Sequence, residues 1–351
     1  MKQLLFICFK SVLMLLCTSF FVFASESEVK KILIVHSYHL DNICGSPQHQ
    51  GVVESLEAKG FKEGKNLEVH AYAMDTKKVN ATPELIRKEA GIVVDIVKDL
   101  RPDVLVLLDD NAFRTVGLDL VDTNVNIVFS GMNGQPEDYD KVKNWLNSRQ
   151  KPGHNITGVY EQLHVNDAFM VQKMILPDLK KAMILSDESP TGKAVMKQVN
   201  RELAQSEQAI DFDIEIVGSW EEYIEKIREA DEDQDIGTIY PAATLLRDKS
   251  GTIHSTSDII RWTVENSKTP GIAINYSFAR LGMFGGAGVD FIAMGRQAGM
   301  MVADILNGAS PGDIPVEEAE RYALVFNLKR AKELGIKIPN DVLMAADAVY
   351  K

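Results

Sequence analysis

The sequence predicts an α/β protein with two Rossmann-like lobes, each built on a doubly wound parallel sheet. Three observations predict this fold. Short apolar segments recur along the chain, helical patterns separate them, and the arrangement begins twice, at Lys30 and at Lys180. Apolar runs of this kind are typical of strands buried on both faces, and strands that alternate with helices form parallel sheets. A chain of 351 residues has room for two lobes of ordinary size.

The expected strands are short and end in polar residues. They are residues 31–36, 104–108, 126–131, 182–187, 236–240 and 271–275. The clearest helix is predicted over 82–100, where Thr82 can cap the first turn, Pro83 suits that turn and apolar residues recur on one face. The two starts, KKILIVHSYHLDN and KKAMILSDESPTG, share a pattern of two lysines, a strand and a polar loop.

The chain is expected to pass between the lobes more than once. Residues 133–155 are rich in Gly, Asn, Pro and charge, and we expect them to connect to the second lobe. GMFGGAG, at 282–288, is expected to be a mobile or tightly turned crossing. The expected lobes are 29–155 with about 285–318, and 156–284 with about 319–351. Two facing sheets of this kind place one ligand cleft at the lobe interface.

The first 24 residues have the features of a secretory signal peptide. A basic start is followed by an apolar stretch over 11–24, which ends in Val-Phe-Ala before a polar segment. We expect cleavage after Ala24 and a periplasmic protein. An uncleaved membrane anchor is the alternative, which Lys10 disfavours because charge within a bilayer is costly. A lipid anchor at Cys17 is disfavoured by Leu16, where a small residue is expected.

The composition excludes several classes of protein. With 45% apolar and 25% charged residues, the chain is neither a disordered nor a polytopic membrane protein. The net charge of −12 argues against nucleic acid and anionic lipid as partners. The three cysteines exclude a disulfide scaffold. Cleavage would leave only Cys44, which could form no internal disulfide.

Polar and aromatic side chains follow most of the expected strands, where ligands bind in open parallel sheets. They can pair with an ammonium, an amide or a carboxylate group, and the tyrosines offer flat apolar surfaces. The alternative for Asp110, Asp187 and Thr191 is that they only cap helices. The candidate ligand-binding residues are Ser37, Tyr38, His39, Asp41, Asp109, Asp110, Asn111, Ser130, Gly131, Asn133, Asp187, Ser189, Thr191, Tyr240, Asn275 and Tyr276.

Catalytic patterns are weak throughout. His36, His39 and Asp41 are possible metal ligands, but the chain has no H-E-x-x-H spacing. It also has no G-x-S-x-G elbow, and Cys44 has no assigned base. GMFGGAG lacks both the Gly-Lys-Ser/Thr ending of a phosphate-binding loop and the spacing of a dinucleotide fingerprint. We therefore expect no catalytic residue, no metal and no cofactor.

Several phrases resemble the ABC-transporter substrate-binding proteins of the tryptophan/tyrosine-binding-like type. The resemblance covers nearly the whole chain after residue 24. It is specific for the family and uninformative about the ligand. The similar phrases are ILIVHSYH, GFKEGKNLEVHAYAMDTKK (60–78), PDVLVLLDDNA (102–112), IVFSGMN (127–133), NITGVYE (155–161) and VFNLKRAKELGIKIPNDVLMAADAVY (325–350).

The resemblance implies a type I periplasmic binding fold, in which two lobes close on a ligand about a hinge. It also implies an ABC permease and its ATPase as partners, with the first binding loop at 37–41. Candidate ligands are an amino acid, a small peptide-like molecule or another small polar compound, and Asp41, Asp109 and Asp110 favour one that carries an amine. We expect a monomer. Relatives with the HSYH start often carry Trp a few residues later. The corresponding segment of this chain, DNICGSPQHQG (41–51), has none, which argues against an aromatic sandwich for the ligand at that position.

Two other functions remain open on the sequence alone. The chain could present a ligand to a separate membrane sensor kinase or cyclase, or it could be a secreted metal-dependent enzyme. Neighbouring genes would separate the first alternative from uptake, and elemental analysis would test the second.

Overall fold

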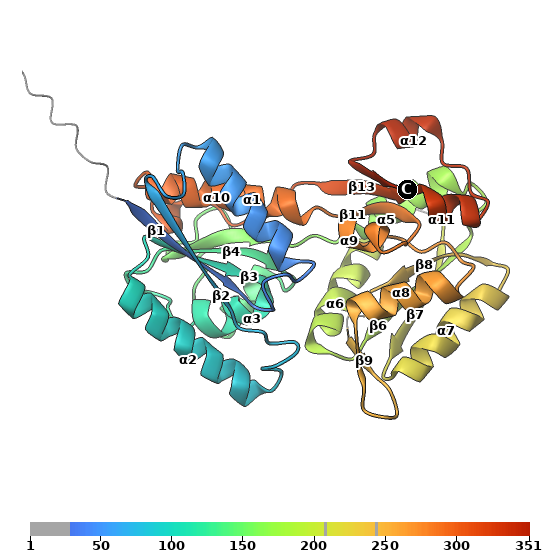
Figure 1. Ribbon diagram of the computed structural model, residues 1–351, viewed down its shortest axis with the longest axis horizontal. Helices are drawn as coiled ribbons and strands as arrows, with labels where there is room; N and C mark the ends of the chain where they lie inside the picture. The colour runs from blue at the N-terminus through green and yellow to red at the C-terminus, as the bar shows by residue number, and fades with distance from the viewer. Residues whose placement is uncertain (1–28, 207–208, 243–244) are drawn as a thin grey trace, which may run out of the picture.

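The computed structural model describes residues 29–206, 209–242 and 245–351, which form two α/β lobes lying side by side (Figure 1). The expected signal peptide, residues 1–24, lies outside the described residues, as does its cleavage site. In the described ranges, no helix has both the length and the apolar character that a membrane crossing requires.

The first lobe is built on a six-stranded sheet in the order β12-β5-β4-β3-β1-β2, in which all neighbours run parallel. Expected strands 31–36, 104–108 and 126–131 are confirmed within one residue at each end. They are wholly or almost wholly buried, which explains their apolar composition. The strands are β1 (Lys30–His36), β2 (Leu67–Ala73), β3 (Val104–Leu108), β4 (Ile127–Met132), β5 (Ile156–Tyr160) and β12 (Glu317–Glu318).

Helices cover both faces of this sheet. The predicted helix at 82–100 is confirmed as α2 (Pro83–Leu100), and the Thr82 hydroxyl accepts a hydrogen bond from the Leu85 amide. Its buried residues form an apolar cluster with one face of the sheet. The other helical segments are α1 (Gly45–Ala58), α3 (Asp109–Ala112), η1 (Phe113–Gly117), α4 (Pro136–Asp140), α10 (Phe291–Leu306) and η2 (Pro311–Asp313).

Helices α1 and α10 lie against each other on the opposite face from α2 (Figure 1). Glycines allow their backbones to meet. A Cβ atom on Gly51 would lie 2.2 Å from the carbonyl oxygen of Ile292, and one on Gly295 would lie 2.1 Å from that of Gln48. The Ser55 hydroxyl also donates to the Arg296 carbonyl. Segments about 240 positions apart in the chain are therefore joined within the first lobe.

The second lobe contains a parallel sheet in the order β7-β6-β8 and a smaller sheet in the order β11-β13-β14. Strands β11 and β13 are antiparallel, and the hairpin β9–β10 lies at the lower end of the lobe (Figure 1). The strands are β6 (Lys181–Asp187), β7 (Asp211–Val217), β8 (Ile236–Pro241), β9 (Leu245–Arg247), β10 (Ile253–Ser255), β11 (Gly285–Val289), β13 (Tyr322–Asn327) and β14 (Ala348–Tyr350).

The second lobe also has helices on both faces of its parallel sheet (Figure 1). Apolar residues of α7 form one cluster with β6 and β8, while α5 and α6 contribute to a larger cluster that continues into the first lobe. The helices are α5 (Val165–Ile175), α6 (Pro190–Leu203), α7 (Trp220–Glu232), α8 (Thr256–Asn266), α9 (Tyr276–Arg280), α11 (Leu328–Glu333) and α12 (Asn340–Met344).

Two expectations in the second lobe are wrong. Residues 271–275 do not form a continuous strand. Gly271 bridges to β8 and Asn275 bridges to β11, so the segment passes from one sheet to the other. GMFGGAG is also no mobile crossing, because Gly285 begins the buried strand β11. Gly285 has φ +129°, and a Cβ atom there would lie 2.2 Å from the Val325 carbonyl oxygen, so glycine is required for this pairing.

The sheets also correct two of the expected lobe boundaries. Strand β5 pairs with β4, so residues 156–160 belong to the first sheet, and β11 pairs with β13 in the second lobe. We therefore place the crossings at residues 161–164, at Asp290 and at 319–321. The predicted connector at 133–155 stays within the first lobe, where it carries the chain from β4 back to the amino end of β5.

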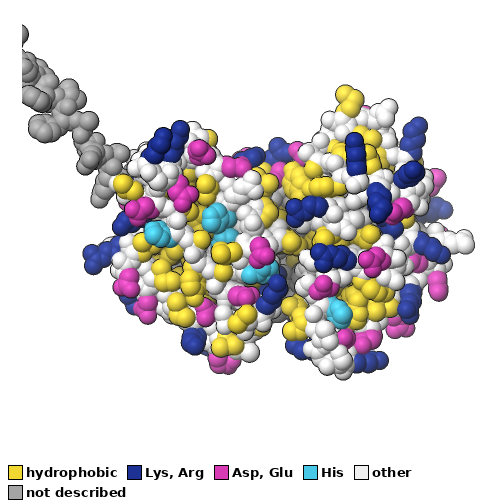
Figure 2. All heavy atoms as spheres, viewed as in Figure 1, with side chains coloured by type: hydrophobic (Ala, Val, Ile, Leu, Met, Phe, Trp, Pro, Cys, Tyr) yellow, Lys and Arg dark blue, Asp and Glu magenta, His cyan; other side chains and the backbone are white. Residues whose placement is uncertain are grey.

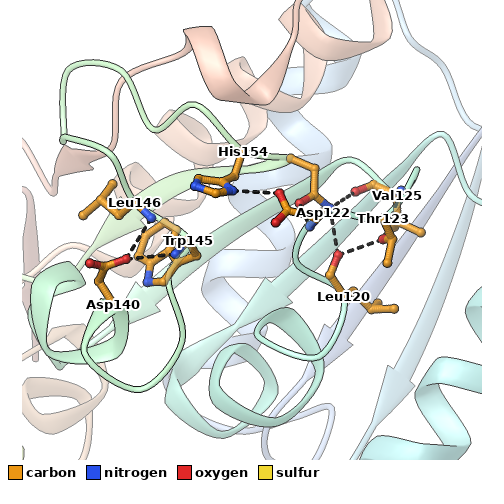
Figure 3. Close-up of polar contacts among 9 residues, drawn as sticks. Leu120, Asp122, Thr123, Val125, Asp140, Trp145, Leu146 and His154 are labelled. Atoms are coloured by element: carbon orange, nitrogen blue, oxygen red, sulfur yellow. Dashed lines mark hydrogen bonds and ion pairs between the residues drawn. The ribbon is translucent and has the colours of Figure 1, made fainter.

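A polar network fixes that return segment (Figure 3). The amide side chain of Asn155 donates to the carbonyls of Leu120 and Val125 and accepts from the Asp122 amide, and His154 contacts the Asp122 carboxylate at 2.7 Å. Asp140 accepts from the two amides of residues 145–146. These contacts hold the amino end of β5, the opposite end from the candidate site described next.

Candidate functional site

A cavity of about 660 Å³ lies between the lobes, at the carboxyl ends of the parallel strands. Figure 2 shows the hollow that separates the lobes on the lower side of the molecule. Both lobes contribute to its wall, and its size is within the usual range for small-molecule sites. The lining residues are Tyr38, His39, Asn42, Ile43, Cys44, Lys77, Lys78, Asp109, Asn133, Glu161, Leu163, Thr191, Val195, Ala242, Leu245, Ile253, Ser255, Thr256, Ser257, Asp258, Arg261, Ile274, Asn275, Phe278 and Phe291.

The cavity brings together part of the set predicted from the sequence. Each of the residues concerned follows a strand or begins a helix at the carboxyl edge of a sheet, as the topology requires. The predicted residues that line it are Tyr38, His39, Asp109, Asn133, Thr191 and Asn275.

Four other predicted residues lie in the first lobe outside the cavity wall, and three of them hold its loops together. The Ser37 hydroxyl donates to the Leu108 carbonyl and accepts from the Ala112 amide. Asp110 accepts from the backbone and side chain of Asn133, from the Gly134 amide and from the Tyr139 hydroxyl. Asn111 donates to Thr76. The Asp41 side chain is 93% exposed and lies 3.8 Å from His39.

The remaining predicted residues also lie outside the described cavity wall. Asp187 accepts from the amides of Ser189 and Leu245, and Ser189 caps α6, which is the alternative considered for this loop. Tyr240 is fully buried against Phe169. The other three occupy regular elements: Ser130 and Gly131 lie in β4, and Tyr276 begins α9.

Sequence reasoning missed several lining residues, and the charged ones among them are Lys77, Lys78, Glu161, Asp258 and Arg261. Lys77 follows β2, an edge strand whose mixed sequence, LEVHAYA, gives no strong strand pattern. Glu161 follows β5, which was expected to begin the second lobe. Both residues lie in phrases that carry the family resemblance. The apolar lining residues, such as Phe278 and Phe291, could not be distinguished from ordinary core residues.

Asp109 is the most unusual residue of the wall. It is 3% exposed and has φ +65°, a conformation that L-residues other than Asn and Asp adopt only rarely. Its Oδ1 atom accepts from the Gln48 side chain at 3.1 Å, while its buried Oδ2 atom has no hydrogen-bond partner among the described residues. Burial raises the pKa of the carboxyl to about 7, and Asp110 adds to this, whereas Lys77 opposes it.

Glu161 lies in the first crossing and is buried. Its backbone is held from both lobes, since its amide donates to the Met132 carbonyl and its carbonyl accepts from the Gln198 side chain. Burial raises the pKa of its carboxyl well above the usual value, and the nearby charge of Asp109 adds to this. The cavity therefore holds two buried acids, both of which ionise less readily than free carboxyls.

Tyr38 connects the charged end of the cavity to the second lobe. The Lys77 ammonium nitrogen lies 3.9 Å from the centre of the Tyr38 ring, a cation–π distance. The Tyr38 hydroxyl interacts with the side chain of Thr191, which lies in the first turn of α6 in the second lobe. The tyrosine is 3% exposed, so the ring and the hydroxyl are both held in place.

The histidines considered as metal ligands do not converge on one point. His36 Nε2 lies 2.9 Å from His49 Nδ1, and burial lowers the pKa of His36 to about 4, so this imidazole stays neutral at ordinary pH. His39 contacts Asp41 on the surface instead. In the part of the chain that the structure describes, no group of three or more His, Cys, Asp or Glu side chains is arranged to hold a metal ion.

The fold and the cavity together agree with the family resemblance. The family model described as "ABC transporter substrate binding protein" matches residues 44–350. The chain belongs to this family. Its fold is that of the type I periplasmic binding proteins. A curated member, the tyrosine-binding protein of Clostridioides difficile, is 22% identical over 294 residues, which is 82% of this chain and 76% of that protein.

Solved structures share the same fold. A conserved domain protein from Vibrio cholerae is 24% identical, with a TM-score of 0.70 over 92% of this chain and 100% of that one. An ABC domain in complex with L-Trp from Streptococcus pneumoniae is 20% identical, with a TM-score of 0.69 over 91% and 99%. A ligand-free, open substrate-binding protein with adhesive properties from Clostridium difficile is 18% identical, with a TM-score of 0.68 over 92% and 100%.

Proposed function

We propose that the protein is the receptor of an ABC importer and delivers an amino acid or an amine-like compound to a membrane permease. Membership of the substrate-binding family supports this role, as do the relatives described as binding tyrosine and L-Trp. The observation that carries the proposal is the cavity between the lobes, because its wall comes from both lobes and the chain crosses between them three times.

With this arrangement, ligand binding can shift the equilibrium between the open and closed forms of the two lobes. A ligand that contacts both walls binds the closed form better than the open form, and so it shifts the population toward closure. The closed shape would then dock on the permease, whose ATPase drives import. For this role the protein would act as a monomer in the periplasm, after removal of residues 1–24. N-terminal sequencing and light scattering of protein from periplasmic extracts test these two points.

The central experiment combines ligand identification with a measurement of closure. Native mass spectrometry of gently purified protein identifies a retained small molecule, and a thermal-shift screen covers the amino acids and their amines. A ligand at about 100 times its Kd should add about 2.7 kcal/mol to stability. Small-angle scattering should then show a smaller radius of gyration with ligand. Failure of every compound to stabilise or close the protein would contradict the proposal.

Two valine variants provide a matched pair for this test. Val195 lines the cavity from α6, so Val195→Arg should fill the space and abolish both stabilisation and closure. Val142 is 71% exposed and lies outside the cavity wall, so Val142→Arg should leave both unchanged. Circular dichroism checks that both variants are folded, and loss of uptake in cells that carry only Val195→Arg would connect binding to transport.

A further inference from the structure

Helix α6 carries a line of positive charge on one side. Lys193, Lys197 and Arg201 follow one another at intervals of four residues, so they lie on one face of the helix. The two lysines are exposed and the arginine is half-buried. Among the described residues, none of these three side chains forms an ion pair or a hydrogen bond. Like charges at this spacing destabilise a helix, so this basic stripe requires a counter-charge from elsewhere.

Helix α6 lies at the boundary between the lobes. Thr191 and Val195 line the cavity, and Figure 1 shows α6 on the side of the second lobe that faces the first. Its carboxyl half is fixed to the first crossing. The Gln198 side chain donates to the Glu161 carbonyl, and Glu202 accepts from the first amide of α5 at 2.5 Å. A bend in the first crossing would therefore carry the basic stripe toward the first lobe or away from it.

Helix α4 of the first lobe carries acidic residues near the same cavity, since Asn133, just before this helix, lines the wall. Glu137 is already engaged, because Arg149 donates to it from Nε at 2.6 Å. Asp138 pairs in the described chain with Lys141 alone, at 2.8 Å, and the lysine side chain is 74% exposed. An exposed pair of this kind contributes little stability, so Asp138 can exchange its partner at small cost.

The charges of α6 and α4 act on each other across the space between the lobes. The hydrogen bond from Lys141 lowers the pKa of Asp138, burial opposes this, and the positive charges of Lys197 and Arg201 lower it further. Arg201 also acts on Tyr160 at the end of β5. In the described chain neither cation reaches the Asp138 carboxylate at ion-pair distance. The two elements therefore face each other with opposite charge and are not in contact.

We propose that the basic stripe binds α4 when the lobes close, so that Asp138 exchanges Lys141 for Lys197 and Arg201. This inference rests on the closure described under the proposed function and adds a contact outside the ligand cavity. A contact that forms only in the closed form shifts the population toward that form. Because no ligand atom takes part, the contact strengthens the binding of every ligand by the same factor and does not select among ligands.

The first test detects the contact directly by treating the dilute wild-type protein with a carbodiimide. This reagent joins a carboxylate and a lysine amine that touch, forming an amide, and takes up the water that is lost. Mass spectrometry of peptides should show an Asp138–Lys197 link, and saturation with L-tyrosine or L-tryptophan should increase it if either binds. The Asp138–Lys141 link is the internal positive control. Lys180 is exposed at the amino end of β6 and should not be linked to Asp138.

The outcome of this cross-linking is decisive in either direction. An Asp138–Lys141 link that forms without any Asp138–Lys197 link would overturn the inference, because the carboxylate would then be reactive but never meet α6. No substitution is needed, so the result does not depend on whether a variant folds.

The second test exchanges the charges. Lys197→Glu and Asp138→Lys should each replace attraction by repulsion, weaken the affinity for the probe amino acids by about three- to tenfold, and increase the ligand-free radius of gyration. The double variant should restore both values. Lys180→Glu, which changes the charge equally at the far end of β6, should match the wild type. Circular dichroism checks folding, and two damaging single variants without rescue in the double variant would contradict the proposed pair.

Salt provides an independent measurement on the same proteins. Added salt screens exposed charges, so the wild-type affinity should fall as the salt concentration rises, while that of Lys197→Glu should rise. If neither amino acid binds, the ligand-free radius of gyration is followed instead. Parallel salt profiles for the two proteins would count against an attractive contact in the closed form.

These measurements separate the contact from its alternatives. If Lys197→Glu abolishes uptake but leaves affinity and radius of gyration unchanged, the basic stripe faces the permease and the interlobe contact is wrong. If a ligand closes the lobes and no Asp138–Lys197 link forms, the contact is wrong while the importer role stands. If the link forms but no compound binds or closes the protein, the contact stands and the proposed function is contradicted.

Discussion

The two walls of the cavity differ in where they carry charge. On the first lobe and the first crossing, Asp109 and Glu161 are buried at the inner end of the cavity. On the second lobe, Asp258 and Arg261 are exposed at the rim, and the inner surface is formed by hydroxyl and apolar side chains. Buried charges interact strongly and exposed charges weakly, because water screens the latter. The difference suggests that the first wall selects the head of the ligand and the second closes over the remainder.

The largest expected effect is on the inner wall, where two adjacent aspartates should respond differently. Asp109→Asn keeps the side-chain shape and tolerates φ +65°, so the fold should persist while amino-acid affinity falls by roughly 10- to 100-fold. Asp110→Asn weakens a set of four donors and should lower the free energy of unfolding by about 2 kcal/mol. Calorimetry and thermal unfolding separate the two outcomes. Equal loss of stability in both would remove the distinction.

The next effect is on pH dependence. Because the pKa of Asp109 is raised to about 7, the carboxyl is largely neutral at pH 6 and ionised at pH 8. An ammonium ligand binds the ionised form, so affinity should increase by about tenfold from pH 6 to pH 8. Asp109→Asn should flatten this profile. An affinity that falls as the pH rises over this interval would contradict the assignment.

Other titratable groups near Asp109 could also contribute to the pH dependence of ligand affinity, and they decide which control variants are needed. Lys77, Asp110 and Glu161 act on it, and the Glu161 carboxyl, whose pKa is also raised, shifts the profile in the same direction. The pKa values of Tyr38 and Cys44 are raised by burial, so neither ionises in this interval. His39 lines the cavity as well. His39→Gln therefore has to retain the wild-type profile.

The same carboxyl should also affect stability without ligand. The folded pKa of Asp109 is above its unfolded value of 3.8, so the folded state binds more protons and loses stability as the pH rises from about 4 to about 7. Asp109→Asn removes this loss. Its Tm should exceed that of the wild type at pH 8, by several degrees, and should approach it at pH 4.5. A lower Tm at pH 8 would show that the ionised carboxyl stabilises the unliganded fold.

A smaller effect is expected where the two walls meet. Tyr38→Phe removes the hydroxyl that interacts with Thr191, and Thr191→Val removes the same interaction from the other side. Each should weaken ligand affinity by at most a few-fold, since even a full neutral hydrogen bond contributes only about 1 kcal/mol. Because both substitutions remove the same contact, the double variant should bind the ligand no more weakly than either single variant. Full additivity in this double-mutant cycle would mean that the two side chains act independently.

The smallest effect is expected at the rim of the second lobe. Arg261→Gln removes an exposed charge near Asp258, and such charges contribute little to affinity because they are screened by water and salt. Affinity should change by less than about threefold, and any change should disappear in high salt. A tenfold loss would instead place a second charged contact on the second wall.

The fold was predictable because burial on both faces determines composition. Strands β1 and β3 contain the continuous apolar runs ILIV and VLVLL, and α2 shows its capping residue and apolar face directly in the sequence. The lobe boundaries were less predictable. Whether β5 pairs with β4 depends on contacts between distant segments, which a local pattern does not contain.

The site was predictable in location but not in chemistry. The rule that ligands bind at strand ends identified Tyr38, Asp109 and Thr191. It could not distinguish Asp109, which lines the cavity, from Asp110, whose carboxylate holds the loop after β4. It also missed Glu161, because the strand before it was assigned to the wrong lobe.

The contact between α1 and α10 has a consequence for how the chain folds. The first lobe needs α10 and β12, yet these segments follow most of the second lobe in the sequence. Ser55 and Arg296 are 241 positions apart where they meet. Contacts between such distant segments slow folding, because a long loop must close before they form. A chain threaded through a secretion channel from its N-terminus could not complete its first lobe until residue 318 had emerged, so it would remain unfolded during export.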